Sequence, residues 1–206
     1  MFKKLWRFIW HDDSLLSWIV NVALAFIIVK FLIYPGLGLI FNTQLPVVAV
    51  VSCSMEHDFT NCGEKKEITL CKESLSENKK INFNEYWGYC GSWYEEIGIE
   101  KKEFESFPMK DGFNKGDIIF LYGTKTIREG DVIVFKGNSA NPIIHRIVKV
   151  KENAYQTKGD HNPDSFAQLS ETNINPSDVL GKAFLRIPYL GWIKIGFTDL
   201  INLFRR

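Results

Sequence analysis

The chain has 206 residues, 46% of them hydrophobic, and a formal net charge of +1 at pH 7. That length supports one medium-sized domain with its own core plus an additional element. The basic residues are scattered rather than gathered into one stripe, so the composition gives no electrostatic indication of nucleic-acid binding.

The first feature along the chain is the apolar stretch LLSWIVNVALAFIIVKFLIY, residues 15–34. About 20 apolar residues in a helix span the hydrocarbon core of a bilayer, and Lys30 lies near one end, where its stem can reach the headgroups. A buried core helix and a cleaved signal peptide are the alternatives, but we find no Ala-x-Ala-like cleavage site. We therefore expect an N-terminal segment, 1–14, followed by a retained transmembrane anchor and exit segment, 15–41.

The distribution of basic residues predicts the orientation of this anchor. Lys3, Lys4 and Arg7 precede it, and no Lys or Arg follows Lys30 until Lys65. Because loops rich in Lys and Arg stay on the cytoplasmic side, we expect a cytoplasmic N-terminus. Residues from 42 onward should then lie outside the cytoplasm.

All four cysteines fall in this predicted exterior part: Cys53, Cys62, Cys71 and Cys90. An oxidising compartment would allow a disulfide among the last three, although spacing does not fix the pairing, and free or buried thiols are the alternative. No CxxC pair or tight Cys/His cluster is present, so we expect no metal site.

Short strand signals dominate the region 42–191, which we expect to be one mainly β domain. The run VVAVV is dense in β-branched residues and leads into Ser-Cys-Ser-Met. Residues 56–112 show no sustained period and are predicted to form an insertion of short helices and loops. Further strands are expected in NKGDIIFLYG (114–123), REGDVIVFKG (128–137), PIIHRIVKV (142–150), YQTKGDHNPDSF (155–166) and GKAFLRIPYLG (181–191).

The last segment, 192–206, has apolar residues at near-helical spacing. It is too short and too interrupted to span a bilayer. An amphipathic helix at the membrane surface, with Arg205 and Arg206 at the headgroups, and a helix packed against the domain are both compatible with this pattern.

Few residues could perform chemistry. Ser54 follows a strand-like run, but a serine hydroxyl needs a base to become a nucleophile. His145, in IIHRI, is a candidate base, although a lone strand histidine is more often structural. Asp160 and Asp164, in the loop sequence GDHNPD, could orient an imidazole or could simply be solvated turn residues.

Taken in order, several phrases closely resemble type I signal peptidases of the archaeal and endoplasmic-reticulum kind. The phrases are SCSMEH, KGDIIFLYG, EGDVIVF, PIIHRIVKV, TKGDHN and GKAFLRIPYLG. The resemblance covers residues 1–54 in organisation and 113–191 in motifs. It implies a mainly β, signal-peptidase-like catalytic domain with one N-terminal transmembrane helix and a small α/loop insertion.

The resemblance also implies roles for single residues. Ser54 matches the nucleophile, and His145 matches the general base that this branch uses where bacterial enzymes use lysine. Ser52 matches the hydroxyl that assists the oxyanion hole beside the Ser54 backbone N–H. Asp160 matches one acidic residue of the family, and Asp164 is taken as the replacement of a second. Either of the two could orient His145.

This sequence departs from the family pattern in three places. The second aspartate of the family usually lies further along the loop, near the position of Phe166. The insertion 56–112 is larger than the family core needs. The usual proline after Met-Glu is His57 here, so the resemblance gives His57 no role.

The implied function is a membrane-bound serine endopeptidase that removes N-terminal signal peptides from secretory precursors, without a cofactor or metal. Its partners would be secretory precursors and membrane lipid, not nucleic acid, and accessory subunits stay open. The location would be the cell membrane in an archaeon or the endoplasmic reticulum membrane in a eukaryote. The alternative is a non-catalytic, membrane-anchored exterior binding module derived from the same fold.

Overall fold

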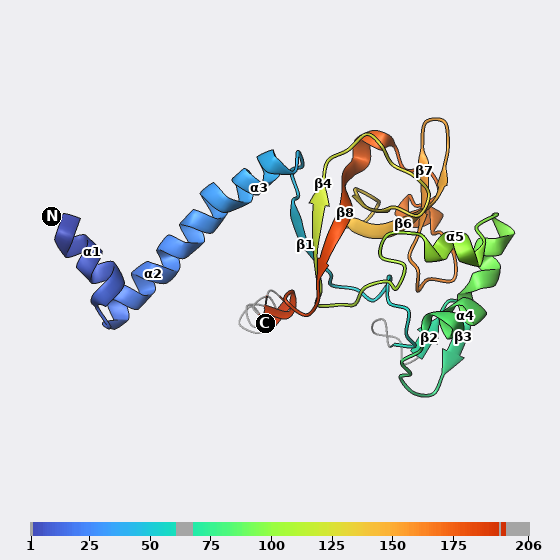
Figure 1. The fold of residues 1–206 in the computed structure, drawn as a ribbon, viewed down its shortest axis with the longest axis horizontal. Helices are drawn as coiled ribbons and strands as arrows, with labels where there is room; N and C mark the ends of the chain where they lie inside the picture. The colour runs from blue at the N-terminus through green and yellow to red at the C-terminus, as the bar shows by residue number, and fades with distance from the viewer. Residues whose placement is uncertain (1, 61–67, 194, 197–206) are drawn as a thin grey trace.

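The structure is a computed structural model that describes residues 2–60, 68–193 and 195–196 (Figure 1). It is rich in β-strands and carries one long N-terminal helix that extends away from the strands. This confirms the predicted fold class. Most of the predicted segment 192–206, including Phe197, Leu200, Ile201 and Phe204, lies outside the described residues.

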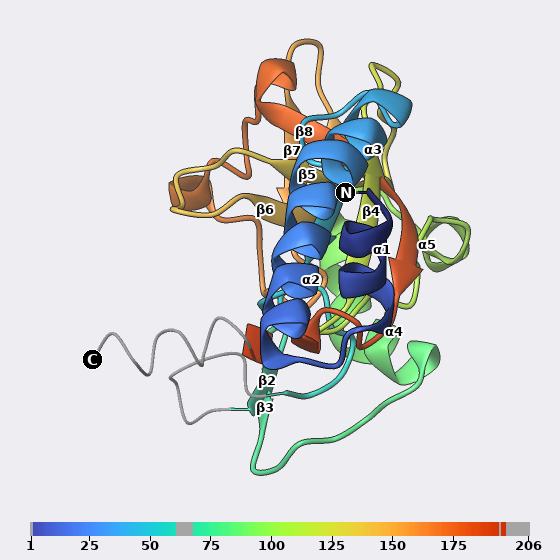
Figure 2. The same ribbon diagram turned by 90° about the vertical axis from the view of Figure 1, so that its left-hand side faces the viewer.

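The N-terminal part begins with α1 (Phe2–His11), which folds back against the first turns of α2 (Leu15–Ile28) (Figures 1 and 2). The helix continues through the π-helical turn η1 (Val29–Ile33) and α3 (Tyr34–Ile40). Two polar side chains of α2 bind α1 carbonyls: Ser17 Oγ donates to Phe8 O at 2.6 Å, and Asn21 Nδ2 donates to Ile9 O at 2.8 Å. These contacts give Ser17 and Asn21, two polar residues of the apolar stretch, hydrogen-bond partners.

Leu15–Ile40 is the one helix in the described part of the chain that is long and apolar enough to cross a membrane. Its 26 residues would extend about 39 Å at about 1.5 Å per residue, more than a hydrocarbon core of about 30 Å requires. Most of its apolar side chains are exposed in the isolated chain. A helix that is apolar on all sides and unburied is expected in lipid rather than water.

The end of this helix is tied to the sheet. Gly123 N donates to Phe41 O at 2.8 Å, and Thr43 Oγ1 donates to Leu180 O at 2.6 Å. Phe41 also packs against Phe184, with ring centroids 5.1 Å apart. These contacts hold the C-terminal end of the long helix next to the main sheet.

The main sheet has six strands in the order β1-β4-β8-β5-β6-β7, and each neighbouring pair is antiparallel. The bounds are β1 Val47–Ala49, β4 Ile118–Tyr122, β5 Val132–Phe135, β6 Ile143–Val150, β7 Tyr155–Lys158 and β8 Val179–Ile187. Five of these strands fall within segments that the sequence predicts to be extended, and β8 begins two residues before its predicted segment, 181–191. Short 3-10 turns, η2 (Ala167–Leu169) and η3 (Pro176–Asp178), connect β7 to β8.

The predicted insertion contains a two-stranded sheet, β2 (Ile68–Leu70) and β3 (Glu73–Leu75), followed by α4 (Phe83–Glu96) and α5 (Lys101–Glu105). Asn82 and Glu85 form a capping box at the start of α4. A disulfide joins Cys71 to Cys90 of α4, which confirms the expectation of a disulfide among the last three cysteines. Buried aromatic side chains of α4 and α5 pack into one hydrophobic cluster with Phe59, Leu70 and Val148 of β6.

Candidate active site

Ser54 lies in the turn that follows β1. Val50 is tied to the neighbouring segment in both directions, donating to Asp117 O at 2.9 Å and accepting from Gly116 N at 2.9 Å. Met55 then buries its side chain in the core. These contacts fix the backbone on both sides of the turn. The Ser54 side chain itself is partly buried.

His145 meets Ser54 across 91 residues of sequence. It lies on β6, is 3% exposed, and pairs with Ile133 of β5. Its Nε2 lies 2.8 Å from Ser54 Oγ, within hydrogen-bond distance. The structure therefore brings together the serine and the histidine that the sequence singles out.

The other ring nitrogen of His145 contacts a carboxylate that the sequence reasoning missed. Nδ1 forms a short contact with Oε1 of Glu171, which is fully buried. The second carboxylate oxygen accepts a hydrogen bond from Phe166 N at 2.6 Å. Backbone pairing holds the segment beside β7, since Thr157 N donates to Glu171 O at 2.9 Å.

Asp160 binds a different set of partners. Its carboxylate accepts from Arg146 Nη2 at 2.6 Å and from Tyr94 Oη at 3.1 Å, and it contacts His57 Nε2 at 3.0 Å. Although burial opposes ionisation, the guanidinium of Arg146 is the main reason that the pKa of Asp160 is far below its usual value. Arg146 follows His145 on β6, and successive strand side chains point to opposite faces, so this carboxylate is not on the His145 side.

Asp164 is exposed, and its described hydrogen bonds come from Trp93 Nε1 at 3.0 Å and Ser165 N at 2.7 Å. The expectation that Asp160 or Asp164 contacts His145 therefore needs correction, because the carboxylate in contact is that of Glu171. Glu171 sits in the sequence LSETN, which has no motif that would have identified it.

The Arg146–Asp160 pair gives a prediction about stability. All the donors of Arg146 are used: Nε and Nη2 bind Asp160, and Nη1 and Nη2 donate to three backbone carbonyls of Pro108, Met109 and Gly130. Asp160→Ala would leave this buried charge uncompensated. We expect the free energy of unfolding to fall by about 3–5 kcal/mol, measured by urea denaturation in detergent.

Asp164→Ala is the matched control, because that carboxylate is exposed. Its free energy of unfolding should change by no more than about 0.5 kcal/mol. An Asp160→Ala protein as stable as the wild type would contradict a structural role for the buried ion pair.

Two further features complete the surroundings of Ser54. The hydroxyl oxygens of Ser52 and Ser54 lie 3.2 Å apart, which places Ser52 beside the expected reaction centre. Gly159 lies so close that an added Cβ would be 2.7 Å from Ser54 O and 2.8 Å from His145 Nε2. Only glycine lets the loop after β7 approach the pair this closely.

A serine hydroxyl, an imidazole and a buried carboxylate in hydrogen-bonded sequence form the arrangement found in serine hydrolases. Among the described residues this arrangement is formed by Ser54, His145 and Glu171. It belongs to a mainly β domain that follows a helix long and apolar enough to cross a membrane.

Comparison with known proteins gives a narrower relationship. The chain is 34% identical over 102 residues to the signal peptidase complex catalytic subunit SEC11C of Homo sapiens and of Mus musculus, which is 44% of this chain and 53% of each relative. It is 32% identical over 103 residues to the signal peptidase complex catalytic subunit sec11 of Neurospora crassa, 44% of this chain and 59% of the relative. No family model matches the chain.

The chain thus spans little more than half the length of the curated relatives that it matches. Within that span they are its homologues, and this confirms the resemblance to signal peptidases that the motifs indicate.

Proposed function

We propose that this protein is a membrane-anchored serine endopeptidase that removes N-terminal signal peptides from secretory precursors. The observation that carries the proposal is the 2.8 Å separation of Ser54 Oγ and His145 Nε2, with Glu171 on the other ring nitrogen. The names of the homologues support the choice of substrate. This arrangement favours an enzyme over a non-catalytic binding module.

The proposed reaction begins with proton transfer. Neutral His145 accepts the Ser54 proton at Nε2 while Oγ attacks the scissile carbonyl carbon. Glu171 accepts the Nδ1–H hydrogen bond, which fixes the tautomer and stabilises the imidazolium that forms. The imidazolium then protonates the leaving amine as the C–N bond breaks, and water hydrolyses the ester on Ser54.

The negative charge on the carbonyl oxygen also needs donors. In this proposal the backbone N–H of Ser54 and the hydroxyl of Ser52 supply them. The 3.2 Å separation of the two hydroxyl oxygens supports that assignment for Ser52. Losing one donor of this kind costs on the order of 10²–10³ in kcat.

The sheet order supports a way to bind the substrate. β1 is the terminal strand of the main sheet and leads directly to Ser54. An extended precursor segment could add to this free edge through backbone hydrogen bonds. The family resemblance implies small side chains at the first and third positions before the cut.

The proposed topology places the N-terminus in the cytoplasm and the peptidase domain, 42–191 with its insertion 56–112, on the other side. The basic residues before the anchor support this orientation. The Cys71–Cys90 disulfide supports it independently, because disulfides persist in oxidising compartments. The anchor confines enzyme and precursor to one membrane, which favours their encounter.

The proposed function is tested with purified protein in lipid vesicles and a precursor that carries a signal peptide. We expect a single cut after a small residue, mapped by mass spectrometry of both products. His145→Ala should reduce kcat about 10⁶-fold, since a serine without its base loses nearly all the advantage of the triad. An intact precursor, or equal cleavage by His145→Ala, would contradict the proposal.

A further inference from the structure

A second buried cluster surrounds His57, three residues after the candidate nucleophile. His57 is 8% exposed, and its Nε2 lies 3.0 Å from Asp160 Oδ2. Its ring stacks on Tyr86 of α4, with centroids 3.7 Å apart and planes 3° apart. The imidazole therefore connects the segment after Ser54 with the insertion.

The segment 54–57 is bound residue by residue to the loop that follows β7. His161 N donates to Ser54 O at 3.0 Å, and Asp160 N lies 3.4 Å from Met55 Sδ. His161 Nδ1 lies 3.1 Å from Glu56 O. With the contact between His57 and Asp160, each of the four residues from Ser54 onward has a partner in this loop.

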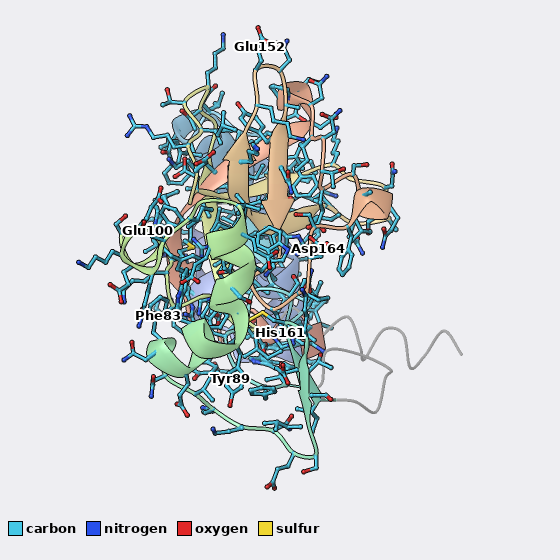
Figure 3. The ribbon with its side chains drawn as sticks, turned by 90° about the vertical axis from the view of Figure 1, so that its right-hand side faces the viewer. Phe83, Tyr89, Glu100, Glu152, His161 and Asp164 are labelled. Carbon is cyan, nitrogen blue, oxygen red and sulfur yellow. A yellow bond between two sulfur atoms is a disulfide. The ribbon has the colours of Figure 1, made fainter. Side chains whose placement is uncertain are left out.

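The insertion holds the same loop from the other side. Tyr86 Oη donates to Asp160 O at 2.9 Å, and Tyr94 Oη donates to the Asp160 carboxylate at 3.1 Å. Cys71 N donates to His161 O at 2.8 Å, and the disulfide fixes Cys71 to α4. Figure 3 shows α4 beside the loop that carries His161 and Asp164.

The protonation state of His57 follows from these surroundings. Burial lowers its pKa, and the hydrogen bond to the Asp160 carboxylate opposes that effect only in part. A neutral imidazole facing a carboxylate carries its proton on Nε2, where it can donate. Nδ1 is buried without a hydrogen-bond partner among the described residues, so the bond to Asp160 and the stacking on Tyr86 orient the ring.

We propose that His57 is a positioning residue for the proposed peptidase, because it couples the disulfide-linked insertion to the turn that presents Ser54. The inference rests on the proposed function and gives the insertion a role in it, which is to hold the turn that presents Ser54. His57 touches neither His145 nor Ser54 through any described hydrogen bond, and acts by fixing the backbone around Ser54. A misplacement of about 1 Å at a reacting atom can cost about 10²-fold in rate.

The test compares two substitutions that separate the hydrogen bond from the ring. His57→Phe keeps the aromatic surface against Tyr86 and removes the donor, whereas His57→Gln restores an N–H donor at the position of Nε2. We expect His57→Phe to lower kcat about 10- to 100-fold with KM within about twofold of the wild type. His57→Gln should recover most of that loss. Tyr89→Phe, on the outer side of α4, is the matched control and should leave kcat unchanged.

Hydrogen exchange gives a second readout that needs no substrate. Faster exchange of the His161 amide in His57→Phe, reversed in His57→Gln, would show that the contact with Ser54 O has loosened. Tyr86→Phe keeps the ring that stacks on His57. It removes the hydrogen bond from Tyr86 Oη to Asp160 O and the 3.4 Å contact with Tyr94 Oη. It should lower kcat and speed exchange by about threefold, which provides a test if His57→Phe folds poorly.

The outcomes separate this inference from the proposed function. If the wild-type protein cleaves no precursor, the proposed function fails, and exchange at His161 still decides whether His57 holds the turn. If the wild type cleaves and His57→Phe shows wild-type kcat and wild-type exchange, the positioning role is overturned. Equal loss of kcat in His57→Phe and His57→Gln would also overturn it.

Discussion

Ser54→Ala is expected to abolish precursor cleavage and to leave the fold intact. The hydroxyl is partly exposed, and its described hydrogen bonds are only those with His145 and Ser52. Its removal leaves no buried group charged and unpaired, so the free energy of unfolding should change little. kcat should fall about 10⁶-fold, because the nucleophile itself is lost.

The measurement is single-turnover cleavage of a labelled precursor at saturating enzyme, with the unfolding midpoint recorded for both proteins. Ser52→Ala is the matched control: it removes a neighbouring hydroxyl, and its kcat should fall only by about 10²–10³. Processing by Ser54→Ala at the wild-type rate would show that another group is the nucleophile.

Glu171→Gln is expected to lower kcat by about 10³–10⁴ with a much smaller effect on KM. Glutamine has one carbonyl oxygen, and the Phe166 N–H, now 2.6 Å from a carboxylate oxygen, would compete for it. The NH₂ group would then face His145 Nδ1 and favour the tautomer with its proton on Nε2. That tautomer cannot accept the proton of Ser54, and replacement of the carboxylate in other Ser-His-Asp sites has a comparable effect.

Asp164→Asn is the matched control for this prediction, because its carboxylate binds Trp93 and lies outside the described contacts of His145. Both variants should be assayed with the same precursor over the same range of concentrations. A large loss in Asp164→Asn together with a normal Glu171→Gln would show that Asp164, and not Glu171, supports His145.

The strands of the main sheet could be predicted because their signals are local. Gly-Asp before an apolar run and Gly after it occurs at both β4 and β5, and alternation marks β6. The long apolar helix Leu15–Ile40 was predictable for the same reason, since length and composition indicate it. The hairpin β2–β3 was not predicted, because two three-residue strands give no period.

The candidate site was only partly predictable. Motif order suggested Ser54 and His145, but their contact joins β6 to the turn after β1 across 91 residues, and no local pattern predicts it. The position of Glu171 depends on a long-range contact. The chain after η2 returns beside β7, where Glu171 O accepts a hydrogen bond from Thr157 N. A single glutamate in an irregular segment has no sequence pattern that would predict this pairing.

Asp160 is the opposite case, because the sequence identified the residue but not its partner. It matched a motif, yet its partner is the neighbour of the expected one, Arg146 rather than His145. A shift of one residue along a strand exchanges the faces of the sheet, and spacing alone cannot choose between them here. The sequence likewise does not predict that aromatic residues of the insertion contact Asp160, because these contacts depend on the position of α4 in the fold.

The proposed reaction requires covalent acylation of Ser54. It is tested most directly with a peptide ester of a signal-peptide cleavage segment, because a good leaving group lets the acyl-enzyme accumulate before water attacks it. The reaction is stopped with acid, and the digested protein is analysed by mass spectrometry. We expect the acyl group on the peptide that contains Ser54 and its absence from Ser54→Ala. An acyl group on another side chain, or equal acylation of Ser54→Ala, would contradict it.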